Sequence, residues 1–492
     1  MRYKYEESLL SRLTAYAESD FYPLHMPGHK RNPGAFAKGE KKFNAAQQYR
    51  AEEVLATAAR LDITEIEGFD NLHEPEGILK DAMDRAARLY GADYTFYSVN
   101  GSTAGLLTAV SSAVPEGGKL IMARNCHKAV YHAVYLRRLR PVYLYPETVR
   151  GLGIADALTA EQVKEALALH SDARAVLLTS PTYDGVTADV EKIAQVVHQY
   201  GIPLIVDAAH GAHFGFHPAF PDSPVHQGAD LTVMSLHKTM PCMTQTALLH
   251  VCGERVSRSR LRMFEEIYQT SSPSYFLMAG MDRCIRLTEE KGAALWDSFT
   301  RQREDFLKRT KELEVLQIIT AGRGDEAIWR MDPGKILIDS SKTGLTGKQL
   351  YDILLERYHL QMEMAAGNYV TAIMTCCDTK EGWERLAEAL CRIDKTCGGQ
   401  VIEEDGRVEK PYPKLDSGCS LSEALDAPVR MVSLSEAEGK ISGAFINLYP
   451  PGIPIVVPGE RLNGEAVELI ESYRQQRLPL CGLRGEAIAI LN

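Results

Sequence analysis

Seven short apolar runs, separated by segments with helical periodicity, lie between residues 94 and 251 of this 492-residue chain. The runs cover residues 94–99, 120–123, 142–145, 175–180, 204–207, 231–234 and 247–251. Between two of them, Ile193, Val196 and Val197 share one face of a helical segment. Such alternation predicts a mostly parallel sheet covered by helices, which places ligand-binding groups at the carboxyl ends of the strands.

One of these runs ends in a lysine. Residues 231–234 are followed by Ser235, His237 and Lys238 before Pro241 forces a turn. Burial favours the neutral amine, so a lysine at a buried strand end has a lowered pKa and can attack a carbonyl group. A surface lysine that caps the strand is the alternative, and it is the more common situation for a lysine taken alone. The other strand ends favour the reactive interpretation.

An aspartate ends the run at residues 204–207. A buried carboxylate is costly unless it meets a positive or proton-bearing partner, and a protonated pyridine nitrogen would serve. Asp207 is therefore a candidate partner for such a ring, and an aspartate that caps the following turn is the alternative.

The first run is followed directly by Asn100, Gly101, Ser102 and Thr103, which open a helical segment at residues 104–113. Free backbone N–H groups at a helix start, a glycine that allows close approach and two hydroxyls favour a site for one phosphate. Serine and threonine are also common N-caps, so this pattern alone is a weak indication.

Histidines stand at two strand ends and in one loop. His127 follows the run at 120–123 and is placed to lie on a cofactor ring, whereas His237 is placed to bind a phosphate or the substrate carboxylate. His210, His213 and His217 suggest a metal site, with Asp207 as a fourth ligand. Their spacing is irregular for a helix and the loop contains two glycines, so we predict no metal.

The length of the chain predicts more than one domain, because 492 residues exceed the size at which a single hydrophobic core keeps growing. Residues 1–60 are expected to form an N-terminal helix and an extended arm, and residues 61–315 a large cofactor-binding domain. A long helix at 276–313 leads into a smaller α+β domain at 316–492, where residues 397–438 read as loops with short elements.

The charge and cysteine content restrict the class of protein. A net charge of −10 argues against a nucleic-acid or membrane-surface role, since both favour a basic patch, and no apolar run approaches the ~18 residues of a membrane span. The ten cysteines form no C-x-x-C pair, and residues 1–20 lack the apolar core of a signal peptide. These features predict reduced thiols in the cytoplasm.

Ordered motifs along nearly the whole chain resemble those of the Orn/Lys/Arg decarboxylases, in the shorter form without an N-terminal wing domain, within the fold-type I enzymes that use pyridoxal 5'-phosphate (PLP). The matching motifs are His25-Met26-Pro27-Gly28-His29-Lys30, Asn100-Gly101-Ser102-Thr103, Arg124-Asn125-Cys126-His127-Lys128, Pro181-Thr182-Tyr183-Asp184-Gly185, Asp207-Ala208-Ala209-His210-Gly211, Ser235-Leu236-His237-Lys238-Thr239, Gln269-Thr270-Ser271-Ser272-Pro273 and Tyr449-Pro450-Pro451-Gly452-Ile453-Pro454. The resemblance implies an aminotransferase-like α/β fold with a mostly parallel seven-stranded sheet.

The resemblance also implies roles for individual residues. Lys238 would form the Schiff base with PLP and Asp207 would pair with the pyridine nitrogen. The remaining cofactor contacts would be His127 and Ala209 on the two ring faces, Ser102, Thr103, Ser235 and His237 at the phosphate, His210 in the same pocket, and Ser271 from the partner subunit of a homodimer. After carbon dioxide leaves, Lys238 or His237 would return a proton to Cα.

The expected reaction is decarboxylation of a basic amino acid, with arginine to agmatine in polyamine synthesis first and lysine or ornithine second. An aminotransferase or lyase on the same fold is the runner-up. A non-catalytic relative would be expected to have lost the lysine or the aspartate, and this chain keeps both. Asp184, Glu363 and Glu460 are candidate acids for the cationic side chain, since a carboxylate grips a guanidinium in bidentate fashion.

Overall fold

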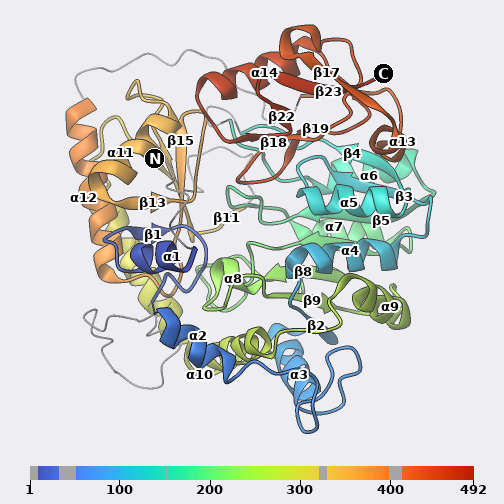
Figure 1. Ribbon diagram of the computed structural model, residues 1–492, viewed down its shortest axis with the longest axis horizontal. Coiled ribbons are helices and arrows are strands. Elements are labelled where there is room, and N and C mark those ends of the chain that lie inside the picture. The colour runs from blue at the N-terminus through green and yellow to red at the C-terminus, as the bar shows by residue number, and fades with distance from the viewer. Residues whose placement is uncertain (1–8, 33–50, 150–152, 321–329, 398–412) are drawn as a thin grey trace.

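The computed structural model describes residues 9–32, 51–149, 153–320, 330–397 and 413–492, and its centre is a seven-stranded sheet (Figure 1). In spatial order the strands are β2 (Tyr94–Ser98), β9 (Ala247–Val251), β8 (Leu231–Ser235), β7 (Leu204–Asp207), β5 (Ala173–Thr179), β3 (Lys119–Ala123) and β4 (Arg140–Leu144). All seven apolar runs lie in this sheet, as predicted.

Strand direction follows the length of the connections. Five strands, β4, β3, β5, β7 and β8, run parallel to one another, whereas β9 is antiparallel to both of its neighbours, β8 and β2. The β8–β9 connection covers only residues 236–246, which is shorter than the dozen or more residues that a parallel crossover needs. The sheet is therefore mostly parallel, with one strand reversed.

Helices cover the sheet and close its core. They are α3 (Ile78–Tyr90), α4 (Gly101–Ala113), α5 (Lys128–Leu136), α6 (Ala160–Leu169), α7 (Val190–His198), α9 (Arg258–Tyr268) and the long α10 (Tyr275–Arg309). Gly91 ends α3 in the left-handed conformation, with φ of 74°. A Cβ added to Gly105 of α4 would lie 3.0 Å from Val233 Cγ1 of β8, so the missing side chain lets this helix approach the sheet closely.

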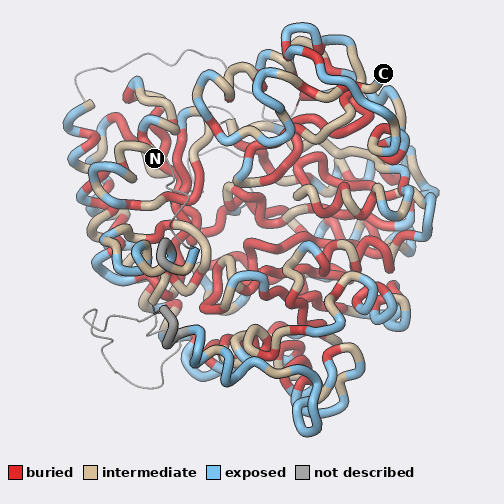
Figure 2. Tube along the Cα trace, viewed as in Figure 1, coloured by how far each residue is buried: buried red, intermediate tan, exposed pale blue. Residues whose placement is uncertain are grey.

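The central strands are buried along their whole length (Figure 2). Leu231, Val233 and Met234 of β8 expose none of their surface. Burial of each such side chain contributes about 1.5–3 kcal/mol, so the strand that precedes Lys238 is rigidly held.

A second group of elements follows α10. The strands β10 (Gln317–Ile319), β12 (Lys335–Asp339), β15 (Tyr369–Ile373) and β14 (Met364–Ala366) form an antiparallel sheet in that order, with α11 (Gly347–Tyr358) and α12 (Lys380–Cys397) beside it. Some of its buried side chains, Ile336 and Trp383 among them, belong to the same core cluster as the large sheet. A two-stranded pairing of β11 (Arg330–Met331) with β6 (Val186–Thr187) also joins the two groups.

Residues 413–492 form a third group with a core cluster of its own. It contains β16 (Asp416–Ser417), α13 (Leu421–Asp426), β17 (Val429–Ser433), η2 (Leu434–Glu436), β18 (Ile446–Leu448), β19 (Pro454–Val456), β20 (Glu460–Arg461), α14 (Gly464–Gln475), β21 (Leu480–Cys481), β22 (Leu483–Arg484) and β23 (Ala487–Leu491). The short elements expected up to residue 438 are present from 413 onward, and residues 398–412 lie outside the described part. We keep the domain limits at residues 60 and 315 as a proposal.

The N-terminal arm lies against the second group of elements. α1 (Leu9–Ala17) precedes β1 (Tyr22–Leu24), which pairs in parallel with β13 (Leu360–Met362), and α2 (Ala51–Ala59) follows. The helix expected from residue 3 is described only from Leu9 onward. No helix among the described residues is both long and apolar enough to cross a bilayer.

Candidate active site

Asp207 and Lys238 lie at neighbouring strand ends. β7 ends at Asp207, and the short helix α8 (Leu236–Thr239) places Lys238 directly after β8. The parallel register pairs Asp207 of β7 with Val233 of β8. Asp207 and Lys238, which comes after β8, therefore lie at the same edge of the sheet. Burial lowers the Lys238 pKa, and the negative charge of Asp207 is the largest effect that opposes this shift. The net result is a lowered pKa at Lys238, as the sequence predicted for a lysine at this place.

Asp207 is 2% exposed and carries one hydrogen bond from the protein backbone. Its Oδ1 accepts from the Ala209 N–H at 3.1 Å. Burial raises the pKa of Asp207, and the Lys238 charge opposes this rise. A buried carboxylate in this state is suited to a further positive or proton-bearing partner.

His210 stands between two lysines. Its Nε2 is 3.0 Å from Lys238 Nζ, and its Nδ1 is 2.9 Å from Lys335 Nζ. Both His210 and Lys335 are buried. Sequence analysis did not single out Lys335, because this lysine opens the apolar run of β12 and does not follow one, as Lys238 does.

His127 caps α5. Its Nδ1 accepts from the Ala129 N–H at 3.1 Å, and burial lowers its pKa to about 3, so the imidazole is neutral at pH 7. A Cβ added to Gly452 would lie 3.4 Å from His127 Nε2, which brings the Tyr449–Pro454 motif against this ring. His127 therefore also has a structural role as the N-cap of α5, and this contact leaves its ring fixed in orientation.

The start of α4 lies close to the β8–β9 connection. Ser98 pairs with Ala247, and Ala247 pairs with Ser235, so the α4 start and Ser235 are two strands apart, about 10 Å. Gly101 adopts φ of 74°, and a Cβ there would lie 3.8 Å from the Gln245 carbonyl. Ser102 and Thr103 stand in the first turn of α4, where backbone N–H groups have no partners within the helix.

His237 is fixed from the same connection. Its Nδ1 donates to the Thr246 carbonyl at 2.9 Å, and burial lowers its pKa to about 4. The neutral ring therefore presents an acceptor at Nε2. A bound phosphate would raise the His237 pKa and favour the protonated ring, because an opposite charge stabilises the imidazolium.

The residues present fit a group with an anion at one end and a protonated ring nitrogen at the other. Among the described residues, Ser235 Oγ is buried without a hydrogen-bond partner, and the Asp207 carboxylate has room for a further donor. The Ser235 N–H donates to the Ala209 carbonyl at 3.3 Å, which ties the two strand ends together. PLP has both chemical features.

Acidic side chains form part of the wall beside His210. Glu363 accepts a short hydrogen bond from the Tyr183 hydroxyl, and its Oε2 accepts from the Met26 N–H at 3.0 Å. Asp184 accepts from the Tyr369 hydroxyl at 3.0 Å, and burial raises the Asp184 pKa to about 6. Both acids remain candidates for a cationic side chain.

Glu460 has a different partner from the one expected. Its Oε2 lies 3.0 Å from Arg124 Nη2 and its Oε1 accepts from Arg124 Nε at 3.2 Å, with both residues buried. Arg124 also donates to the Pro454 and Ile455 carbonyls, at 2.6 and 3.0 Å. The expectation that Glu460 binds substrate is corrected, because its charge is already neutralised in an ion pair that attaches the C-terminal group to the large domain.

The three loop histidines have separate partners. His210 meets the two lysines, His213 Nε2 lies 2.9 Å from Asp332 Oδ1, and His217 Nε2 lies 3.2 Å from Asp297 Oδ1. Within the described part of the chain, no three histidine, cysteine or acidic side chains are grouped to hold a metal ion.

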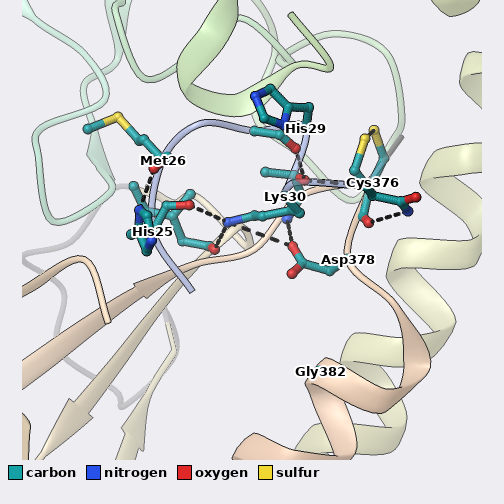
Figure 3. A network of polar contacts seen from close by, with 12 residues as sticks. His25, Met26, His29, Lys30, Cys376, Asp378 and Gly382 are labelled. Atoms are coloured by element: carbon teal, nitrogen blue, oxygen red, sulfur yellow. Dashed lines mark hydrogen bonds and ion pairs between the residues drawn. The ribbon is translucent and has the colours of Figure 1, made fainter. Parts of the chain in front are cut away.

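The motif at residues 25–30, part of which is drawn in Figure 3, contacts the turn that holds Lys238. The Gly28 N–H donates to the His237 carbonyl at 2.7 Å, and the Gly28 carbonyl accepts from Thr375 Oγ1 at 2.6 Å. A Cβ on Gly28 would lie 2.7 Å from the Met240 carbonyl oxygen, so only glycine permits this approach. Lys30 anchors the motif by donating to the His25 and Ile373 carbonyls at 2.9 and 2.5 Å.

Ser271 is exposed and stands apart from these contacts. It belongs to the loop after α9, where Gln269 Oε1 accepts from the Val99 N–H and His73 Nε2 lies 2.9 Å from the Thr270 carbonyl. Its assignment to a neighbouring subunit's site stays a prediction.

Family comparison agrees with this arrangement. The model of "Orn/Lys/Arg decarboxylase, major domain" matches residues 8–337, and that of "Orn/Lys/Arg decarboxylase, C-terminal domain" matches residues 408–484. The arginine decarboxylase of Bacillus subtilis (strain 168) is 32% identical over 481 residues, which are 97% of this chain and 96% of that protein. The arginine decarboxylase of Bacillus anthracis is 31% identical over 483 residues, 97% of this chain and 95% of that protein.

Solved structures match the fold. The lysine decarboxylase LdcF of Francisella novicida superimposes with a TM-score of 0.75 at 16% identity, covering 99% of this chain and 84% of that one. Ureidoglycine-glyoxylate aminotransferase from Bacillus subtilis gives 0.55 at 12% identity, covering 72% and 92%. The expected aminotransferase-like fold is thereby confirmed.

Proposed function

The chain belongs to the Orn/Lys/Arg decarboxylase family, and on that premise we propose that it uses PLP to decarboxylate L-arginine to agmatine and carbon dioxide. The observation that carries the proposal is the pair of buried strand ends, with the Lys238 amine and the Asp207 carboxylate at one edge of the sheet. A nucleophilic amine with a lowered pKa next to a buried acid is the arrangement that PLP chemistry requires.

We assign the cofactor contacts from the same edge. Lys238 would hold the cofactor covalently, and Asp207 would hold a proton at its ring nitrogen. The neutral His127 ring and Ala209 would pack on its two faces, with His210 beside them. The remaining contacts, at the phosphate, would come from Ser102, Thr103, Ser235 and His237. Bound PLP supplies an electron sink for the electrons of the breaking Cα–carboxylate bond.

The protein's own residues would then orient and protonate the substrate. A fixed His127 ring holds the reacting group in one plane, and Asp207 keeps the proton that makes the sink effective. His237 donates its Nδ1 proton to the Thr246 carbonyl, and an Nε2 proton gained on phosphate binding would be held by that phosphate. This favours Lys238 over His237 as the group that returns a proton to Cα.

Arginine is proposed as substrate because the two Bacillus relatives above are arginine decarboxylases. Asp184 and Glu363 are the acids proposed to face its guanidinium, which a carboxylate can hold in bidentate fashion. More distant relatives act on lysine by name, for example lysine decarboxylase LdcA of Pseudomonas aeruginosa, 23% identical over 566 residues, 94% of this chain and 74% of that protein. Lysine is therefore the second candidate and ornithine the third. An aminotransferase or lyase would be recognised by keto acid or ammonia among the products.

The working unit is proposed to be a homodimer in the cytoplasm. The exposed loop with Ser271 supports a contribution to the partner's site, and all ten cysteines are free thiols, as expected in a reducing compartment. A monomer that keeps full activity at high dilution would contradict the dimer.

The substrate is tested by comparing kcat/KM for arginine, lysine and ornithine, with the amine and carbon dioxide both measured. We expect arginine to be preferred by roughly tenfold or more, about 1.4 kcal/mol in the barrier. A similar preference for lysine or ornithine would reject arginine and leave the decarboxylase assignment intact.

A further inference from the structure

Three side chains form a continuous polar chain beside the proposed cofactor site. Lys238 Nζ lies 3.0 Å from His210 Nε2, and Lys335 Nζ lies 2.9 Å from His210 Nδ1. His210 is 5% exposed and Lys335 is 2% exposed, whereas Lys238 is partly exposed. The sequence motifs and the proposed mechanism leave Lys335 without a role.

The chemistry of imidazole restricts the protons in this chain. A neutral histidine has one N–H donor and one acceptor nitrogen, and an ammonium group can only donate. Two charged lysines cannot both make good hydrogen bonds to one neutral ring. A charged His210 would place three positive groups in a row, and burial together with both lysine charges lowers the His210 pKa well below its usual range. One lysine is therefore charged and the other is a neutral amine.

The surroundings decide which lysine carries the charge. Burial lowers the Lys335 pKa to about 8; the carboxylates of Glu363, Asp332 and Asp184 oppose this by stabilising its ammonium, and Lys238 adds to it. Lys238 is faced by the carboxylates of Asp207 and Glu363. The Tyr183 ring also lies 5.1 Å from Lys335 Nζ, in position for a cation–π contact. Lys335 is accordingly the ammonium that donates to Nδ1, and the Nε2–H of His210 donates to a neutral Lys238 amine.

We propose that Lys335 is a positioning residue that acts on Lys238 through His210, keeping the Lys238 amine neutral for attack and supplying it with a proton later in the cycle. The inference rests on the proposed function, because it assigns Lys335 a part in the same reaction. It applies to the stages in which the Lys238 amine is free.

The proton step is a tautomer exchange along the chain. Lys335 releases one proton to Nδ1, His210 releases its Nε2 proton, and Lys238 accepts it. The products are a neutral Lys335 amine, a neutral His210 with its proton on Nδ1, and a Lys238 ammonium. One proton leaves and one arrives, so no co-reactant is needed.

The fold holds Lys335 in place for this task. The turn before β12 is closed by Asp332, whose carbonyl accepts from the Lys335 N–H at 3.0 Å and whose carboxylate lies 2.9 Å from His213 Nε2. On the other side, a Cβ added to Gly185 would lie 2.7 Å from Lys335 Cγ. Gly185 also has φ of 98°. The glycine of the 181–185 motif therefore makes room for the Lys335 stem.

The first test measures how fast the full-length apoprotein takes up PLP at different pH values, followed by visible absorbance and by mapping of Lys238 after borohydride reduction. Uptake requires the neutral amine, so its rate rises with pH through the Lys238 pKa. The Lys335 charge lowers that pKa. In Lys335→Met the midpoint should move up by about one pH unit, which is roughly a tenfold slower uptake below it.

Matched variants separate charge from proton supply. Lys335→Arg keeps a charge but does not release a proton, so its uptake profile should stay near that of the parent while kcat falls by roughly tenfold. Lys348→Met, which removes a lysine from the partly exposed pair with Asp352, should change neither quantity. If Lys335→Met fails to fold by circular dichroism, Lys335→Gln provides the same neutral substitution.

A third measurement tests whether the effect passes through His210. In a His210→Gln background, Lys335→Arg should lower kcat no further, because without the connecting ring Lys335 cannot pass a proton to Lys238. An additive loss of kcat, an unchanged midpoint in Lys335→Met, or parent-like kcat in Lys335→Arg would overturn the proposal. A parent protein that takes up no PLP on Lys238 would instead overturn the proposed function.

Discussion

Lys30 is buried and Lys238 is partly buried, and the hydrogen-bond partners of the two lysines differ in kind. Lys30 donates to two backbone carbonyls and lies 3.9 Å from Asp378 Oδ2 (Figure 3). Lys238 meets the titratable ring of His210. Burial lowers the pKa of both lysines, so burial alone does not mark the reactive one.

The partners explain the difference. Carbonyl oxygens accept hydrogen bonds without exchanging protons, so the Lys30 charge is fixed and its task is to fasten residues 25–30 to the second group of elements. The His210 imidazole has one donor and one acceptor nitrogen and can pass a proton between its two lysines, so the Lys238 amine can change its protonation state. A buried lysine with a titratable partner is suited to chemistry, and one with carbonyl partners is suited to structure.

The largest expected effect is on turnover in Lys238→Ala. Removal of the nucleophile should lower kcat by roughly four orders of magnitude or more and abolish the visible absorbance of bound PLP, while the melting temperature changes little. Amine product formation and absorbance spectra are the measurements. A variant with normal turnover would remove Lys238 from the active site.

Asp207→Asn is expected to come next. The amide cannot hold the ring-nitrogen proton by charge, so the barrier to decarboxylation should rise by about 4 kcal/mol. The measurement is kcat at saturating PLP and substrate. A rate within a few-fold of the parent would show that the Asp207 carboxylate is structural.

Lys30→Met is expected to lower stability and to leave PLP binding intact, the opposite of what is expected for Lys238→Ala. It leaves Asp378 buried without its cation, so the free energy of unfolding should fall by about 3 kcal/mol while folded protein still binds PLP. Urea unfolding and absorbance spectra give the two quantities. Lys348→Met is the control, with an expected loss of about 0.5 kcal/mol or less. Loss of PLP binding at unchanged stability would place Lys30 with the reactive lysine.

The smallest effect is expected at Asp184. Its pKa is raised to about 6 by burial, so the carboxylate is charged above pH 6 and becomes neutral as the pH falls through that value. If Asp184 faces the guanidinium, KM for arginine should rise below pH 6, by roughly tenfold or about 1.4 kcal/mol. Asp184→Asn should show the higher KM at all pH values. An unchanged KM profile in this variant would leave Glu363 as the remaining candidate.

Local patterns were sufficient for the frame of the fold and for part of the site. The apolar runs predicted the seven strands of the large sheet. Asp207 and Lys238 were recognised because each polar residue directly follows a buried run. Such signals lie within a few neighbouring residues, so a single sequence contains them.

Other contacts needed the folded chain. Arg124 takes Glu460 out of the substrate wall. Arg124 stands in one matching motif and Glu460 lies beyond another, and nothing along the chain indicates their pairing. Likewise, the histidines at 210, 213 and 217 look like one metal-binding set in sequence but separate in the structure.

By itself, then, the sequence determined the mostly parallel sheet and the family. It also determined the two polar residues at the carboxyl ends of β7 and β8, because burial periodicity and strand ends are local properties. Only the tertiary structure decided which buried lysine meets a titratable partner. Residues 239–334 separate Lys238 from Lys335 along the chain, and His210 joins them only after β12 has packed against the large domain. Protonation depends on such neighbours in space, which the order of residues alone does not specify.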